Sequence, residues 1–205
     1  MPNYRRPRVP GATVFFTVCL AELDSRLLVD RIDLLREAVR VTKARRPFRI
    51  DAWVVLPDHM HAVWTLPEND ANFSDRWGAI KARFSRHVRL AGAELGGNAV
   101  GCKPTLRCGE RTAQERRVGL QPTDSGTTRA TPSYRYPPRS PSKVAKGEAG
   151  IWQRRFWEHH VRGDEDRAAC IRYCHIDPVK HALVGAPEAW PYSSVHREIR
   201  EGRWP

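Results

Sequence analysis

Apolar residues recur with two different periods in the first fifty residues of the chain, and each period predicts an element. Residues 13–20 are rich in β-branched and aromatic side chains, which is typical of a strand. Residues 27–45 carry apolar side chains at helical spacing with charged residues between them, which predicts an amphipathic helix. The end of this helix is basic and precedes Pro47, as the helix dipole and the backbone restriction before proline favour.

The next forty residues repeat this alternation of strand and helix patterns. Apolar runs at 48–56 and 60–66 predict two strands, and the break at Pro57 and Asp58 suits a tight antiparallel hairpin. Residues 73–90 place Trp, Ile, Phe and Val along one helical stripe with arginines and a lysine off it. This pattern predicts a second amphipathic helix.

The amino-acid composition of the chain changes between about residues 91 and 149. Gly, Pro, Ser, Thr and Arg dominate there and no period persists, which predicts a flexible basic insertion. An aromatic and arginine-rich strand is expected at 150–162, followed by a helix over 167–177 that stops at Pro178. A short terminal helix is expected after Ser193 or Ser194 as its cap.

This order of elements predicts one fold class. Strand, helix, strand, strand, helix opens a ferredoxin-like α/β sandwich, an α+β fold with an antiparallel sheet and helices on one face. The chain of 205 residues is expected to form a single domain that the insertion at 91–149 interrupts.

Charge then narrows the class of partner. The formal net charge is +12, which favours a polyanion, and nucleic acid is the first to consider. Binding to an anionic membrane surface, or solubility alone, would also account for this charge. No apolar run approaches the roughly 20 residues of a spanning helix, and no signal core follows the first residues, so a cytoplasmic protein is expected.

The five cysteines indicate reduced thiols. Their number is odd and no close C-x-x-C pair occurs, which disfavours a disulfide framework. Cys102 and Cys108 could be combined with Cys170, Cys174 and His175 in a zinc site, but these spacings fit no standard pattern.

The hairpin predicted above carries the first candidate chemistry. In a strand, His59 and His61 project to one face and Met60 to the other, so two imidazoles offer half of a divalent-metal site. On the later helix, Tyr173 and Asp177 are four residues apart and share a face. A metal between these groups would polarise a phosphate that the tyrosine attacks.

Each of these features also has a plain structural origin. A polar strand face produces a His-x-His pair by chance, a helical tyrosine is usually part of a core, and Asp177 precedes Pro178 at a predicted helix end. The residues alone leave both the structural and the catalytic interpretation open.

Three motifs together resemble the REP-associated tyrosine transposases, domesticated relatives of the bacterial single-tyrosine HUH transposases. The resemblance covers nearly the whole chain except the insertion. Its motifs are residues 53–61 (WVVLPDHMH), 152–159 (WQRRFWEH) and 173–181 (YCHIDPVKH).

The resemblance implies a HUH nuclease fold that binds single-stranded DNA beside a small hairpin in repetitive extragenic palindromes (REPs) and reads a short 5′ tetranucleotide. It implies that His59 and His61 are metal ligands, with Asp177 beside them, and that Tyr173 is the nucleophile. The tyrosine would form a 5′-phosphotyrosine link and release a 3′-hydroxyl, with Mg²⁺ or Mn²⁺ assisting.

The chain departs from the family pattern in two places. Asp177 stands where the family usually has Asn, which adds a negative charge near the phosphate and bears on metal preference or rate. The insertion after Leu90 stands where typical members pass directly to the Trp-Gln-x-Arg-Phe strand.

Basic and aromatic residues outside these motifs are candidates for DNA contact. Arginines would clamp phosphates and tryptophans would stack on unpaired bases, although any single arginine more commonly belongs to a solvated helix face. The candidate DNA-binding residues are Arg5, Arg6, Arg83, Arg86, Arg154, Arg155 and Trp157.

Two functions remain open on this fold. The first is a DNA strand-transfer nuclease, and the second is a non-catalytic protein that binds hairpin DNA or RNA. The presence of both histidines and the tyrosine favours the enzyme. The resemblance further implies a monomer that acts at the nucleoid.

Overall fold

The computed structural model describes residues 6–95 and 150–204 of the chain. Within these ranges the strands are β1 (Thr13–Cys19), β2 (Arg49–Val55), β3 (His59–Thr65) and β4 (Trp157–His160). The helices are α1 (Leu27–Asp30), α2 (Ile32–Arg45), α3 (Phe73–Leu95), α5 (Gly163–Lys180), the 3₁₀ helix η1 (Pro187–Ala189) and α6 (Val195–Arg200).

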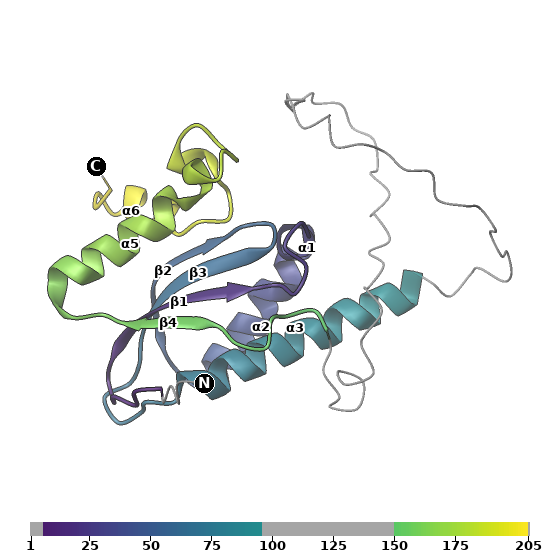
Figure 1. Cartoon of the computed structure of the whole chain (residues 1–205), viewed down its shortest axis with the longest axis horizontal. Helices are drawn as coiled ribbons and strands as arrows, with labels where there is room; N and C mark the ends of the chain where they lie inside the picture. Colours follow the sequence, from purple (N-terminus) through teal and green to yellow (C-terminus); the bar gives the residue numbers. More distant parts are fainter. Residues whose placement is uncertain (1–5, 96–149, 205) are drawn as a thin grey trace, which may run out of the picture.

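The four strands form one antiparallel sheet in the order β2-β3-β1-β4 (Figure 1). The strands β1 and β3 are central, and their register pairs Thr17 with His61 and Cys19 with His59. This order, with α2 and α3 in the crossovers, is that of the ferredoxin-like α+β sandwich. The predicted fold class is confirmed.

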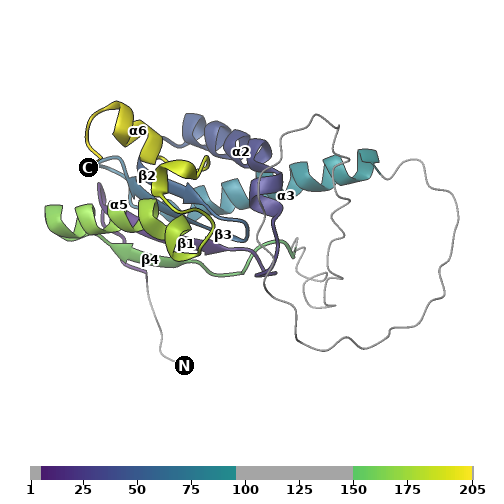
Figure 2. The same ribbon diagram turned by 90° about the horizontal axis from the view of Figure 1, so that it is seen from above.

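Helices cover both faces of this sheet (Figure 2). The helices α2 and α3 bury their apolar stripes on one face, in a core that includes Phe16, Trp64 and Trp77. The helix α5 packs on the other face, where Cys174 contacts the cluster of Val54 and its buried neighbours. The prediction of helices on one face is therefore right for α2 and α3 and wrong for α5. Both faces of the central strands are apolar, so both need cover.

The alternation of side chains along β3 positions the two histidines. Met60 and Trp64 belong to the core beneath α2 and α3, whereas Val63 belongs to the cluster beneath α5. Since side chains alternate along a strand, His59 and His61 lie on the α5 face with Val63. The expectation that the histidines share a face opposite Met60 is correct.

Two predicted helix boundaries differ from the structure. The helix expected over 27–45 is broken at Arg31, whose φ of −125° and ψ of 35° are not helical. The helix expected over 73–90 continues to Leu95, so the insertion predicted at 91–149 begins inside α3. The rest of that insertion, from residue 96, lies outside the described residues.

The last predicted strand and helix also have different boundaries. The strand expected at 150–162 is shorter in the structure, where β4 has four residues. Trp152, which precedes β4, forms an isolated β-bridge with Leu20. The helix α5 does not stop at Pro178 but continues to Lys180. A proline removes one backbone donor, which a helix tolerates in its last turn, and the N–H of His181 still donates to the Asp177 carbonyl at 3.0 Å.

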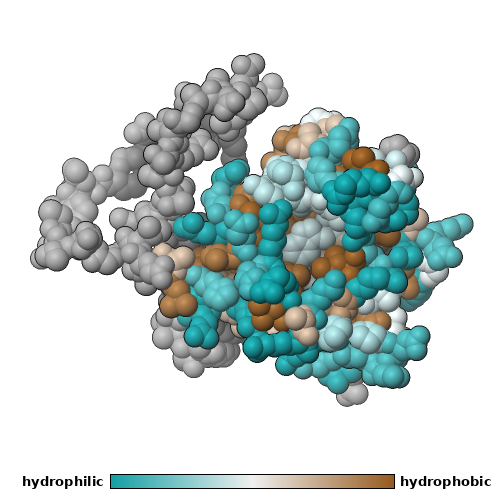
Figure 3. Space-filling model, turned by 180° about the vertical axis from the view of Figure 1, so that it is seen from behind, coloured by the Kyte–Doolittle hydropathy of each residue, from teal (hydrophilic) through white to brown (hydrophobic). Residues whose placement is uncertain are grey.

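The face of the molecule opposite to the view of Figure 1 is mainly hydrophilic. Seen from behind, the molecule shows polar side chains with hydrophobic ones scattered between them (Figure 3). Across residues 6–95 and 150–204, no helix combines the length and the hydropathy that crossing a membrane requires.

Candidate metal and tyrosine site

The two histidines of β3 are each held by a hydrogen bond to Nδ1. Asp58 Oδ1 lies 2.7 Å from Nδ1 of His59, and Thr17 Oγ1 lies 2.9 Å from Nδ1 of His61. An oxygen that accepts from Nδ1 fixes the ring and favours the tautomer whose Nε2 is free to bind a metal. Both rings therefore present Nε2 to the helix α5.

Asp177 of α5 faces these two nitrogens. Its Oδ2 lies 3.2 Å from Nε2 of His61 and 3.6 Å from Nε2 of His59, and the side chain is 1% exposed. Among the described residues no group donates this oxygen a well-formed hydrogen bond. A buried carboxylate oxygen without a donor, opposite two imidazole nitrogens, indicates a cation site.

Charges in this cluster stabilise one another. Burial by itself raises the pKa of Asp177, but His59 and His61 hold the pKa of this carboxyl well below its usual range. Burial lowers the pKa of His59, but the carboxylates of Asp177 and Asp58 outweigh it and raise that pKa overall. The site is therefore built to hold a negative carboxylate beside a positive group.

His181 is a further candidate ligand that the sequence did not single out. Its Nε2 lies 3.8 Å from Asp177 Oδ2, and the donor atoms of His59, Asp177 and His181 lie within 4.8 Å of one another. His181 follows Asp177 by four residues, a helical spacing that could have indicated it. The predicted stop at Pro178 hid this signal, because it ended the helix before His181.

These residues fit a hard or borderline divalent cation. Imidazole nitrogens together with one carboxylate suit Mn²⁺ or Zn²⁺, and the carboxylate also suits Mg²⁺. The candidate ligands are His59, His61, Asp177 and His181, which converge from β3 and the end of α5.

Tyr173 lies one helical turn before Asp177, at the edge of the same cluster. Its ring centroid is 5.1 Å from that of His61 and 5.7 Å from that of Phe15, both edge-on. The side chain is 40% exposed, and Lys180 Nζ lies 3.9 Å from its ring centroid. Burial and the Asp177 carboxylate raise the pKa of Tyr173, so the phenol is protonated at neutral pH.

Only part of the predicted DNA-binding set lies near this tyrosine. Trp157 of β4 is 58% exposed and makes an edge contact with Phe15 at 5.8 Å, on the same face as Tyr173. Arg154 and Arg155 are exposed in the segment that leads into β4. Trp157 therefore neighbours Tyr173 through the shared contact with Phe15.

The other predicted contacts lie elsewhere. Arg83 and Arg86 belong to α3, which covers the opposite face of the sheet. Arg6 donates to Glu158 at 3.0 Å and stacks over Phe156 at 4.0 Å, so its charge is matched inside the protein. Arg5 lies outside the described residues.

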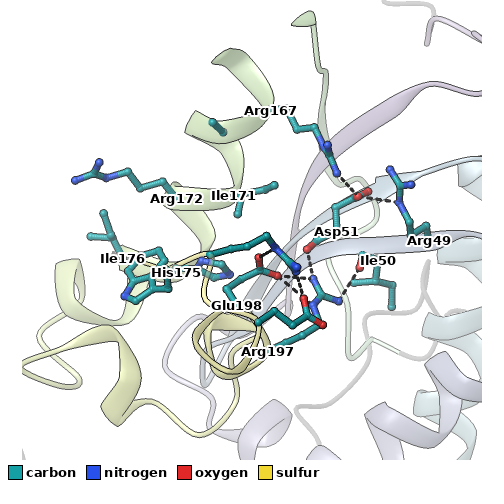
Figure 4. Close-up of a pocket in the computed structure, with 14 residues that line it drawn as sticks. Arg49, Ile50, Asp51, Arg167, Ile171, Arg172, His175, Ile176, Arg197 and Glu198 are labelled. Atoms are coloured by element: carbon teal, nitrogen blue, oxygen red, sulfur yellow. Dashed lines mark hydrogen bonds and ion pairs between the residues drawn. The ribbon is translucent and has the colours of Figure 1, made fainter. Parts of the chain in front are cut away.

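A cavity of about 760 Å³ lies on the other side of α5, between β2 and α6 (Figure 4). Asp51 in its wall accepts hydrogen bonds from Arg49 at 2.9 Å, Arg167 at 2.7 Å and Thr65 at 2.6 Å. Arg197 of α6 donates to the carbonyls of Ile50 and Asp51. These bonds tie α5 and α6 to the edge of the sheet.

Replacing Asp51 is expected to destabilise the fold. Asp51→Ala removes a carboxylate that is 3% exposed and accepts hydrogen bonds from three side chains. Its partners Arg49 and Arg167 are exposed enough to be hydrated after the change. We expect the free energy of unfolding to fall by about 2–3 kcal/mol, as for hydrogen bonds to charged groups. Urea denaturation measures this, with Asp33→Ala at a 93% exposed carboxylate as control, expected within about 0.5 kcal/mol of the parent. An equal loss of unfolding free energy in Asp51→Ala and Asp33→Ala would contradict a stabilising role for the Asp51 hydrogen bonds.

Comparison with known proteins identifies relatives across the whole chain. It is 35% identical over 205 residues, 100% of this chain and 89% of the relative, to the REP-associated tyrosine transposase of Escherichia coli K12. It is 32% identical over the same length to a Haemophilus influenzae protein named for the same family, of which it covers 92%. No protein-family model matches the chain.

A solved structure agrees with these relatives. The structure of the REP-associated tyrosine transposase bound to a REP hairpin superposes with a TM-score of 0.67 at 34% identity, over 100% of this chain and 89% of the other. These relatives, which match the whole chain, place it in the class of tyrosine transposases. Within that class, the chain belongs to the family of REP-associated tyrosine transposases.

Proposed function

We propose that this chain is a divalent-metal-dependent nuclease and strand transferase for single-stranded DNA that carries a REP-like hairpin. Tyr173 is the nucleophile, and His59, His61 and Asp177 hold Mg²⁺ or Mn²⁺. The observation that carries this proposal is the convergence of α5 on β3, where Tyr173 and Asp177 both lie against the two histidines. Its family membership and a relative solved with a REP hairpin support the DNA substrate.

The reaction is a phosphoryl transfer to the tyrosine. The Tyr173 oxygen attacks the scissile phosphorus, and its bond to phosphorus forms as the bond to the 3′-oxygen breaks. The phenol loses its proton, and the departing oxygen gains one to become a 3′-hydroxyl. The 5′-phosphate stays on the tyrosine until a 3′-hydroxyl attacks it in reverse, which rejoins a strand.

The residues around Tyr173 prepare it for this step. Lys180 over the ring favours negative charge on the phenol, and Phe15 limits the positions that the ring can take. The Asp177 carboxylate opposes ionisation of the phenol as long as its charge is unmatched. A bound divalent cation supplies Lewis-acid stabilisation of the phosphate and balances that carboxylate.

Asp177 distinguishes this site from the family's usual Asn. An amide would offer one neutral oxygen, whereas Asp177 offers a charged oxygen on a side chain that is 1% exposed. A carboxylate strengthens cation binding but adds charge beside the phosphate. We infer that Asp177 gives this chain tighter metal binding and a weaker attraction for the DNA phosphate.

The proposed DNA path crosses the exposed end of β4. Trp157 offers an exposed aromatic face for an unpaired base, and Arg154 and Arg155 lie beside it along the chain. In this proposal the active form is a monomer, in which Tyr173 acts beside the histidine pair of its own chain.

Incubation with a hairpin oligonucleotide tests this function. The purified protein is mixed with single-stranded REP-like DNA, with Mn²⁺, with Mg²⁺ or with EDTA, and run on a denaturing gel. We expect a slow protein–DNA band and a shortened 3′-hydroxyl fragment only with metal. Hairpin binding without either product, across several host REP sequences, would instead favour a non-catalytic hairpin-binding protein.

A further inference from the structure

A second group of metal-ligand side chains lies between β4 and the first half of α5. His159 Nε2 lies 2.8 Å from Asp166 Oδ2 and 3.1 Å from Oδ1, and Cys170 Sγ lies 3.7 Å from Oδ1. All three donor atoms lie within 4.8 Å of one another. This group contains a thiol, which the cluster around Asp177 lacks, so the two differ in chemistry.

The local structure fixes the orientation of these donors. The backbone N–H of Arg162 donates to Asp166 Oδ2 at 2.7 Å, which anchors the carboxylate at the start of α5. Cys170 follows Asp166 by four residues and so lies on the same helical face. The ring of Trp157 stacks parallel to that of His159 at 6.0 Å. Two elements therefore present three oriented donors to one point.

The donor set and its spacing match zinc. Zinc binds imidazole and carboxylate at about 2.0 Å and thiolate at about 2.3 Å, in tetrahedral sites that place ligand atoms roughly 3.3–3.7 Å apart. The measured nitrogen–oxygen and sulfur–oxygen separations of 2.8–3.7 Å bracket that spacing. His159 and Asp166 are 37% and 29% exposed, which leaves an entry path and a fourth position for water.

Metal binding requires the Cys170 thiol to lose its proton. Burial and the Asp166 carboxylate raise the pKa of Cys170 to about 11, so the free protein carries a protonated thiol at neutral pH. A dication beside the sulfur reverses this balance, and binding releases the thiol proton.

We propose that His159, Asp166 and Cys170 form a structural zinc site that ties β4 to α5. The site stands apart from the cluster around Asp177 and does not depend on the proposed function. It lies one helical turn before Tyr173, which follows Cys170 by three residues. Trp157 stacks on His159 and contacts Phe15, and Phe15 contacts Tyr173. Packed rings therefore also connect the zinc site to the tyrosine.

The zinc site would add to the contacts that hold the first half of α5. There Arg167 donates to Asp51 of β2 at 2.7 Å, and Asp166 is held by His159 and by the Arg162 N–H. Zinc would add a bond from β4 to the helix at Cys170. The position of Tyr173 over the sheet would then be set at both ends of α5.

Cobalt substitution tests this site without any DNA reaction. The reduced full-length protein is titrated with Co²⁺, and we expect a near-ultraviolet thiolate-to-cobalt charge-transfer band with one thiolate. The band should vanish in Cys170→Ser and persist in the double variant His59→Ala/His61→Ala, whose altered site contains no sulfur. It should also persist in Cys102→Ser/Cys108→Ser and in Cys19→Ser.

Thermal unfolding provides a second measurement. In the His59→Ala/His61→Ala background, zinc at about 100 times its Kd should raise Tm by roughly 5–10 °C, and His159→Gln should abolish the shift. A charge-transfer band that survives in Cys170→Ser would overturn the site. So would a zinc shift that survives in His159→Gln, or the absence of both signals in the parent protein. Loss of DNA cleavage with the cobalt band intact would count against the proposed function alone.

Discussion

Tyr173→Phe is expected to abolish the covalent protein–DNA adduct while hairpin affinity changes less than about threefold. The substitution removes only the oxygen that would bond to phosphorus. The ring keeps its edge contacts with His61 and Phe15. Because no other group replaces a lost nucleophile, the rate should fall at least about 10³-fold. Denaturing gels measure the adduct, and a native gel shift measures binding.

Tyr192→Phe is the matched control for this change. Tyr192 packs partly buried against the core on the α2 side, beside Trp190. Its loss should leave the adduct intact. An adduct that persists in Tyr173→Phe and disappears in Tyr192→Phe would move the nucleophile to Tyr192 and refute the assignment.

His59→Ala should eliminate metal-dependent cleavage. The change removes one of the two nitrogens that face Asp177 and leaves that buried carboxylate short of a positive partner. Loss of an outer-shell partner costs about 10–100-fold in metal affinity, so loss of a ligand should cost at least about 100-fold. Cleavage rates over a Mn²⁺ titration give the apparent metal affinity, and circular dichroism checks that the variant folds.

Two further variants define this result. His87→Ala changes a histidine of α3, on the opposite face of the sheet, and should cleave like the parent protein. Asp177→Asn keeps an oxygen toward the histidines and removes its charge, so we expect cleavage to persist with a higher metal requirement. Metal-dependent cleavage that is unchanged in His59→Ala would exclude the proposed ligand set.

Periodicity explains which parts of the site could be predicted. The two-residue period of β3 places His59 and His61 on one face, and the helical period of α5 places Tyr173 beside Asp177. Both relations are local, so the sequence contains them. The histidine pair meets Tyr173 and Asp177 because α5 packs on the second face of the sheet. No local pattern contains this packing, and only the family resemblance implied it.

The sequence does not contain nonlocal partners or small energy differences. Arg6, a predicted DNA contact, is paired by the fold with Glu158, which is 152 residues away and which no local pattern indicates. The predicted end of the helix at Pro178 was wrong, because the backbone hydrogen bonds after the proline still form. The helix therefore continues and places His181 near Asp177. A pattern records the preference of a segment but not the partner that the fold brings to it.

The edge of β2 is closed by residues that come much later in the chain. Ser193 bridges Val54, the Ser194 N–H donates to the Trp53 carbonyl at 2.8 Å, and Trp190 Nε1 donates to the Val55 carbonyl at 2.9 Å. During synthesis, these strand groups therefore remain unpaired until the C-terminal segment, 135 residues beyond Val55 at Trp190, has been added. Over that interval the edge of β2 is open to pairing with other chains, which makes it a site of aggregation risk during synthesis.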